Sequence, residues 1–362
     1  MRRWTRACGI MSAGSILAGL MLIVGLLGPA CDDDPTGPDH PDLPDGKDYV
    51  FYYRDQATGT LYGYHLVSER VDTFTVPYVA RFGMFVSADG QRLYVAGPQA
   101  TGVVALATRT LVAELPYAQY PVGNGIIFSP DGRFMAFLGS TLTILTYPDH
   151  EPVFRDTMGA GTGCFTPGGE RLYYVPPGAD QVRVVETTGG EARVHPRVFN
   201  PRLSKIRVLS DESRWVLYQS ISCDIGGVVS VYDPIRDTME FQEWFYLSCG
   251  MLAVSADDRW AFYDNPGPLL NPVPGTPLEF RVLNLVTKRL DRLVSTVGIA
   301  DGLNPQDMAV GWLYVSPDSR WLVAAGTWGD QFLVFDVRHL KVDRYIKLDG
   351  FWSDMFAGQE GL

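Results

Sequence analysis

The sequence has no long runs of the helix-forming residues alanine, glutamate, lysine and leucine, so it does not predict a helical protein. Glycine and proline are plentiful instead, with 38 and 25 residues, which suits a chain with many turns. The 362 residues exceed an ordinary single-core domain, unless that domain is a barrel or a repeat array. With 46% hydrophobic residues the composition is that of a folded protein, and we expect mostly β structure.

Motifs of common catalytic sites are also missing. The chain has no HExxH zinc motif, no GxSxG nucleophile turn, no phosphate-binding loop and no Cys-x-x-Cys pair. Its histidines are scattered, and no two stand at the spacing of metal ligands. We therefore predict no catalytic residues, no metal site and no cofactor. The histidines are His40, His65, His150, His195 and His339.

The N-terminus has the layout of a secretory signal peptide. Three arginines lie within the first six residues, and residues 9–30 are uncharged and mostly apolar. The small residues Gly28 and Ala30 precede Cys31, an arrangement that resembles a bacterial lipoprotein signal, in which the cysteine is lipidated. We expect residues 1–30 to be the signal peptide and Cys31 to carry the lipid. Plain secretion and an uncleaved membrane anchor are the alternatives.

The residues after Cys31 predict a flexible tether. Residues 32–47 contain six aspartates and four prolines and almost nothing apolar, and they lack the alternating pattern of a calcium loop. Removing residues 1–31 takes away three arginines and no acidic residue, so the net charge changes from −11 to −14. This charge argues against nucleic acid and anionic membrane surfaces as partners. Residues 48–362 remain as the folded domain.

A short corner recurs along this domain. It reads SADG at 87–90 and SPDG at 129–132, and successive copies are spaced by 42, 37, 44, 45 and 61 residues. Each copy stands between two apolar runs, and its Pro, Asp and Gly residues suit a tight turn between strands. A period near 40–45 with several short strands is typical of propeller blades. The other copies are TPGG at 166–169, SDES at 210–213, SADD at 255–258 and SPDS at 316–319.

One unit is close to a known repeat. Residues 94–132 read YVAGPQATGVVALATRTLVAELPYAQYPVGNGIIFSPDG and resemble the YVTN-type β-propeller repeat. Residues 205–247 and 310–348 resemble it moderately. The Gly-His and Trp-Asp marks of WD-type blades are absent. The resemblance implies the fold that the period predicts, with four strands in each blade.

The ends of the domain predict seven blades. The corners mark six blades, and upstream of them lie three strands that lack an inner strand. Residues 351–358 (FWSDMFAG) predict one strand with no blade after it, and we expect it to complete the N-terminal blade. The fold class is therefore all-β, a seven-bladed propeller of four-stranded antiparallel blades; six or eight blades are the alternatives. The 61-residue spacing predicts a long inserted loop at 265–279.

Several polar residues fall at or just before the starts of inner strands. In a propeller these positions surround the mouth of the central channel, where ligands commonly bind. The alternative is a solvated rim. Asp233 and Asp336 end third strands and are expected to shape the next turn, and Trp244, Trp312 and Trp352 are expected to pack between blades. The candidate binding residues are Arg81, Asn124, Lys205, Asp307 and Asp354.

Three cysteines remain in the mature chain besides Cys31. Cys164 lies in the inner-strand run GCF, where a buried free thiol is expected. Cys223 follows a second strand and Cys249 a fourth strand, and these two kinds of connection leave a blade at the same face. In an oxidising compartment we expect a Cys223–Cys249 disulfide, with two free thiols as the alternative.

Together these features favour a binding protein over an enzyme. We expect a monomeric, lipid-anchored propeller in the bacterial cell envelope, periplasmic or on the cell surface, that binds a protein or a glycan through one face. Membrane contact is expected through the lipid alone. Some propellers that resemble this one are lactonases or subunits of quinoprotein amine dehydrogenases, so a lactonase-like hydrolase and a redox accessory subunit are the alternatives.

The anchor gives the first testable prediction. Cys31→Ser is expected to release the protein into the soluble fraction, because the variant has no residue that takes the lipid chains needed for stable anchoring. Cys8→Ser lies in the expected signal peptide and should leave the protein membrane-bound. Cell fractionation followed by immunoblotting measures both variants. A Cys31→Ser protein as membrane-bound as the wild type would contradict the lipoprotein assignment.

Overall fold

A computed structural model describes most of residues 48–362, which belong to one compact unit of residues 44–362. The expected signal peptide, Cys31 and the tether lie outside the described residues. The described part contains no α-helix, and hence no helix that is long and apolar enough to cross a membrane. The described ranges are 48–54, 60–74, 83–97, 99–117, 125–199, 203–222, 226–245, 252–264, 279–295, 310–326, 331–347 and 355–360.

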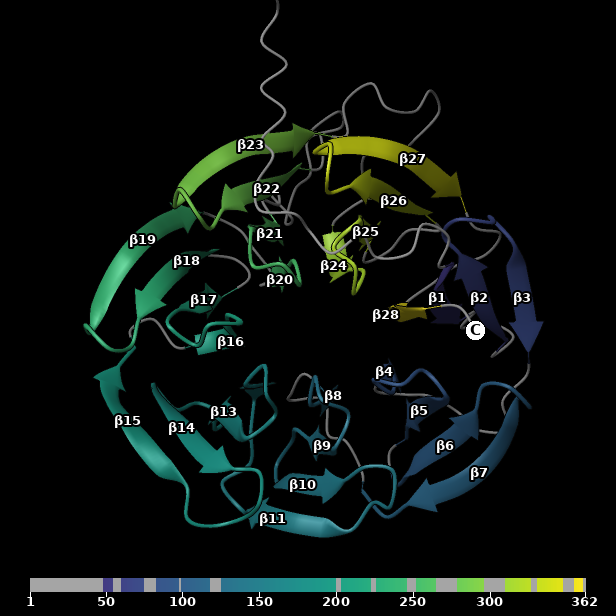
Figure 1. Ribbon diagram of the computed structural model, residues 1–362, viewed down its shortest axis with the longest axis horizontal. Helices are drawn as coiled ribbons and strands as arrows, with labels where there is room; N and C mark the ends of the chain where they lie inside the picture. Colours follow the sequence, from purple (N-terminus) through teal and green to yellow (C-terminus); the bar gives the residue numbers. More distant parts are fainter. Residues whose placement is uncertain are drawn as a thin grey trace, which may run out of the picture. The chain divides into compact units, whose positions relative to one another are not determined.

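The strands form seven four-stranded antiparallel sheets, which are the seven blades of a β-propeller (Figure 1). Blade 1 contains β28 (Met355–Glu360), β1 (Tyr49–Arg54), β2 (Leu61–His65) and β3 (Val71–Phe74). Blade 2 contains β4 (Gly83–Val86), β5 (Arg92–Ala96), β6 (Thr101–Ala105) and β7 (Thr110–Leu115). Blade 3 contains β8 (Ile126–Phe128), β9 (Phe134–Phe137), β10 (Leu142–Thr146) and β11 (Pro152–Asp156).

The remaining blades follow in chain order, each with its inner strand first. Blade 4 contains β12 (Thr162–Phe165), β13 (Arg171–Val175), β14 (Gln181–Glu186) and β15 (Arg193–Val198). Blade 5 contains β16 (Leu203–Val208), β17 (Trp215–Ser222), β18 (Gly226–Asp233) and β19 (Thr238–Phe245). Blade 6 contains β20 (Leu252–Val254), β21 (Trp260–Asp264), β22 (Glu279–Asn284) and β23 (Arg289–Ser295). Blade 7 contains β24 (Val310–Val315), β25 (Trp321–Gly326), β26 (Gln331–Asp336) and β27 (Lys341–Lys347).

The C-terminal strand closes the ring, as the sequence predicts. β28 pairs antiparallel with β1, and Tyr53 stands opposite Met355 while Tyr49 stands opposite Glu360. The strand is Met355–Glu360, so the predicted boundaries of 351–358 are wrong by several residues. The antiparallel partner determines where β28 begins. Met355 pairs with Tyr53, and β1 ends one residue later at Arg54, so residues before Met355 have almost no partner strand left.

The recurrent corner joins the first strand of a blade to the second. In blade 3 the Ser129 hydroxyl donates to Asp131 Oδ1 at 2.6 Å and accepts from the Phe134 amide at 2.9 Å, which fixes the turn. The fourth corner residue has a positive φ, 70° at Gly132, a conformation that glycine adopts without a steric penalty. The Ser and Gly of the motif are therefore explained by the turn itself.

The corner predicted at residues 210–213 in blade 5 is wrong by one residue. The first corner amide bonds to a carbonyl five residues later, as Ser87 does to Arg92 at 2.9 Å. In blade 5 the matching bond runs from Leu209 to Arg214 at 3.0 Å, and the matching positive φ of 54° is at Glu212. The corner is therefore 209–212 and not 210–213, because leucine takes the place of the usual serine or threonine.

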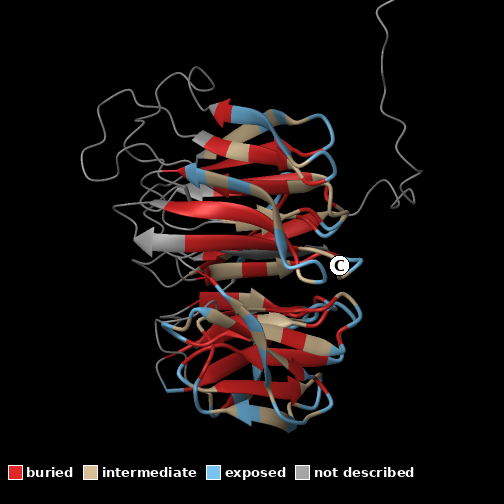
Figure 2. Ribbon diagram, turned by 90° about the vertical axis from the view of Figure 1, so that its left-hand side faces the viewer, coloured by how far each residue is buried: buried red, intermediate tan, exposed pale blue. Residues whose placement is uncertain are grey.

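The core of the propeller lies between blades. Seven hydrophobic clusters of described residues each combine side chains from two neighbouring blades, so every boundary has one. Between blades 1 and 7, for example, Phe332 packs against Phe51, with ring centroids 5.3 Å apart, and against Tyr64. Figure 2 shows the buried strands in red. Aromatic and β-branched residues suit these positions because they fill the space between two pleated sheets.

The long spacing between the last two corners has two sources. The predicted insertion falls at 265–278, between β21 and β22, and a second long connection at 296–309 joins β23 to β24. Both segments lie outside the described residues.

Ring closure can be tested by truncation. Deleting residues 355–362 removes β28 and leaves the edge of β1 unpaired. We expect aggregation and a fall in melting temperature on the order of 10 °C or more. Deleting only residues 361–362, which lie beyond β28, is the matched control and should change little. A protein without 355–362 that melts cooperatively at the wild-type temperature would refute closure by this strand.

Candidate functional site

Connections leave each antiparallel blade at two opposite faces. The corners and the turns between third and fourth strands lie on one face, here called the turn face, and the remaining connections lie on the other, the loop face. Six predicted residues lie outside the described residues, namely Arg81, Asn124, Cys223, Cys249, Asp307 and Asp354. Lys205, on β16, is the one predicted site residue that the described part contains.

The inner strands enclose a central cavity of about 690 Å³. Figure 1 looks down this channel, with β4, β8, β16, β20, β24 and β28 around its centre. The described lining comes from the six inner strands β4, β8, β12, β16, β20 and β24 and from the corners that follow them. A cavity of this size accommodates a small organic molecule or a few side chains of a partner.

One position of each inner strand contributes to the channel wall at the same level. It stands two residues before its corner, and the pairing with the second strand is equivalent in each blade: Phe85 stands opposite Tyr94 as Arg207 stands opposite Val216. The wall here is apolar apart from Arg207 and the hydroxyl of Tyr314. These residues, the channel ring, are Phe85, Ile127, Cys164, Arg207, Ala253 and Tyr314.

Blade 5 gives the channel its charge. Lys205 and Arg207 both line the cavity and are two residues apart on β16, so their side chains leave the same side of the strand. Ile206 and Val208 point the other way, into the core shared with blade 4, and are 6% and 1% exposed. Lys205 and Arg207 are the charged residues of the described lining, which contains no acidic side chain. The described channel wall is thus apolar with a local positive charge.

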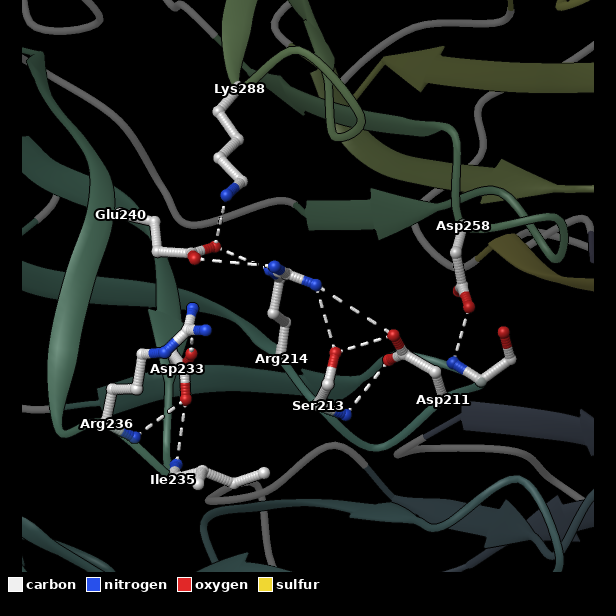
Figure 3. A network of polar contacts seen from close by, with 10 residues as sticks. Asp211, Ser213, Arg214, Asp233, Ile235, Arg236, Glu240, Asp258 and Lys288 are labelled. Carbon is white, nitrogen blue, oxygen red and sulfur yellow. Dashed lines mark hydrogen bonds and ion pairs between the residues drawn. The ribbon is translucent and has the colours of Figure 1, made fainter.

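Polar contacts hold blade 5 against blade 6 on the turn face (Figure 3). Arg214, which follows the blade 5 corner, donates from Nε to Glu240 Oε2 at 2.5 Å, and Lys288 of blade 6 lies 2.7 Å from the same oxygen. The hydrogen bond from Arg214, together with Lys288, lowers the pKa of Glu240 to about 2. Asp258 of the next corner accepts from the amide of Ser210. The end of β16 that carries Arg207 is therefore fixed by its neighbours.

A second acid on the same outer strand crosses the same boundary. Glu243 of β19 accepts a hydrogen bond from Tyr263 and pairs with Arg281, both in blade 6. Burial and this hydrogen bond raise the pKa of Tyr263. An equivalent group joins blades 3 and 4, where Asp156 Oδ2 lies 2.5 Å from the Tyr174 hydroxyl and 2.6 Å from an Arg183 nitrogen.

The turn-shaping roles expected of Asp233 and Asp336 and the buried free thiol expected at Cys164 are confirmed. Asp233 accepts from the amides of Ile235 and Arg236, both at 2.9 Å, and Asp336 accepts from the His339 amide at 3.0 Å, so each shapes a turn. Cys164 is a buried free thiol. Among the described residues no group of His, Cys, Asp or Glu is arranged to hold a metal ion.

Trp244 contradicts the prediction of blade packing. It lies on the outermost strand β19 and is 57% exposed, while its neighbour Phe245 faces the core and is 5% exposed. Alternation along the strand decides this, because only every second side chain can face the next blade. The side chain of Trp312 and the whole of Trp352 lie outside the described residues.

Arg207 is the channel residue that sequence reasoning missed. The signal was present, since the residue two places before each corner lines the channel. The candidates were chosen at the starts of inner strands, whereas Arg207 lies near the end of its strand, next to the corner.

The sequence matches no protein-family profile, and no curated protein matches it. Among solved structures the chain is similar to hydrazine synthase of Kuenenia stuttgartiensis, with a TM-score of 0.58 and 12% identity over 76% of this chain and 88% of that chain. It is also similar to the β-propeller domain of Cps50 (Swd1) from Myceliophteria thermophila, with a TM-score of 0.57 and 10% identity over 76% and 89%. At such identities the likeness shows the propeller fold alone.

The contacts between blades 5 and 6 make stability depend on pH. Because the pKa of Glu240 falls from 4.5 to about 2 on folding, its contribution is complete above pH 4.5 and is lost as the pH falls toward 2. Glu240→Gln should lower the free energy of unfolding by roughly 1–3 kcal/mol at pH 7. That difference should shrink between pH 4.5 and pH 3 in urea unfolding experiments.

The control for this prediction is Glu114→Gln. Glu114 lies on β7, also an outermost strand, and is exposed, so its loss should change the free energy of unfolding by less than about 0.5 kcal/mol. Equal effects of the two substitutions at pH 7 would show that the Arg214–Glu240–Lys288 contact does not stabilise the fold.

Proposed function

We propose that this protein is a YVTN-type propeller, lipid-anchored in a bacterial cell envelope, that acts as a non-catalytic binding or scaffold module for a protein partner. The N-terminal pattern ending at Cys31 supports the anchor, and the propeller supports a rigid platform with a channel at its centre. The observation that carries the proposal is the channel ring, which is apolar on most sides and cationic at one blade.

The chemistry of this wall favours a protein over a glycan. A sugar presents many hydroxyl groups, and burying them against Phe85, Ile127 and Ala253 would leave them without hydrogen-bond partners. A segment of a protein offers apolar side chains to the same surface and an acidic side chain to Arg207. Arginine next to apolar residues is also typical of the few interface positions that contribute most to affinity.

Purification of the anchored protein from its native envelope tests this proposal. After mild cross-linking, the full-length chain should be recovered with one protein in a stoichiometric ratio, and mass spectrometry should place the cross-links on the loop face or the channel. The control is the same purification from a strain that expresses the Cys31→Ser protein. A partner that meets the propeller only at the membrane should not be recovered with this variant. Recovery of a stoichiometric metal, with lactone hydrolysis by the purified chain, would overturn the proposal in favour of a hydrolase.

A further inference from the structure

Arg207 differs from the other partly buried arginines of the propeller. Arg183, Arg281 and Arg214 each pair with an acid, namely Asp156, Glu243 and Glu240. Arg207 has no such acid among the described residues. Arg183 and Arg281 join neighbouring blades and Arg214 holds the outer strand of its own blade, whereas Arg207 lies on the wall of an open cavity. A role in holding blades together therefore does not explain it.

Arg207 also contains a hydrogen-bond donor without an acceptor. Its Nε is buried, and no acceptor lies within hydrogen-bond distance in the part of the chain that the structure describes. The Nε atoms of Arg281 and Arg344 are also buried without an acceptor, but those guanidinium groups pair with Glu243 and Glu69 through a terminal nitrogen. Arg207 has neither kind of partner among the described residues, and a buried donor that makes no bond destabilises a folded protein unless a ligand completes it. A planar guanidinium is matched by a carboxylate, whose two oxygens accept from Nε and a terminal nitrogen together.

Lys205 extends the positive charge along the channel. Lys205 lies on the same side of β16 as Arg207, two residues earlier in the strand. It is therefore about 7 Å nearer to the loop face. Its ammonium is a flexible point charge, which suits a second contact to the ligand or attraction of an anion that enters from the loop face. The channel thus offers one directional contact and one less specific contact.

We infer that Arg207 and Lys205 form a carboxylate-binding site in the channel, whose ligand has an apolar body that packs on Phe85, Ile127 and Ala253. A phosphate fits less well, because its second charge and larger hydration shell would be buried against the apolar ring in a strongly acidic protein. The carboxylate comes either from a small organic acid or from an acidic side chain of the partner, and in the second case the inference rests on the proposed function.

Calorimetric titration of the purified full-length protein with phenylacetate tests the site. Phenylacetate should bind, and its neutral isostere phenylacetamide and inorganic phosphate should bind at least tenfold more weakly. Arg207→Met should weaken phenylacetate binding roughly 10- to 100-fold, as expected for loss of a hydrogen-bonded charge pair, and Lys205→Met should weaken it less. Arg289 is exposed on β23, away from the channel lining, so Arg289→Met removes the same charge and should change nothing.

A second readout does not need the ligand. Without phenylacetate, Arg207→Met should melt at the wild-type temperature or above it, because it removes an unsatisfied donor, whereas Arg183→Met should melt lower, because it breaks a pair. The inference is overturned if Arg207→Met melts as low as Arg183→Met, if it binds phenylacetate as the wild type does, or if phosphate binds as tightly as phenylacetate.

The source of the carboxylate is decided by competition. Excess phenylacetate that displaces the co-purified partner places an acidic side chain of that partner in the channel. Binding of phenylacetate without displacement assigns the site to a small organic acid. Absence of any binding overturns the site while leaving the proposed function intact, since the partner would still be recovered from the envelope.

Discussion

Each blade is a four-stranded sheet with apolar residues on both faces, and it can bury them only against the blades beside it. All seven hydrophobic clusters of the described core accordingly cross a boundary between blades. The chain leaves blade 7 and returns as β28 to pair with β1, which links the last blade to the first. Removing this strand leaves the edge of β1 unpaired and breaks that link, so the stability of the ring depends on the closure.

The closed ring also determines which side chains can contact a ligand. On the turn face, residues such as Ser129, Asp131 and Asp233 use their polar groups to hold turns of the chain itself. On the inner strands, one side chain in two packs between blades, and Ile206 and Val208 show this for blade 5. The alternate side chains line the channel, and in the other blades they also pack against a cluster between blades, as Phe85 and Tyr314 do. Function is therefore expected in the channel ring, where Arg207 replaces the apolar residues of other blades.

The corners and the count of blades were predictable because a tight turn restricts its residues strongly, and the chain repeats the same turn six times. The error at blade 5 arose where Leu209 replaces serine and the backbone keeps the turn without the hydroxyl bond. The exposure of Trp244 was missed because an aromatic residue was assumed to pack, although it alternates with buried Phe245. Contacts across boundaries, such as Lys288 with Glu240, join distant segments, so no local pattern predicts them.

The charge of the protein restricts what the channel accepts. The mature chain carries a net charge of −14 if it begins at Cys31, whereas the described channel wall carries only the positive charges of Lys205 and Arg207. An anion farther from the acidic surface than the Debye length, roughly 8 Å, is screened from it by salt. An anion that comes closer than this is repelled. A ligand with one carboxylate on an apolar body, or a partner with a basic surface around one acidic side chain, meets this repulsion least. The arrangement thus selects against polyanions more effectively than a channel with many cations would.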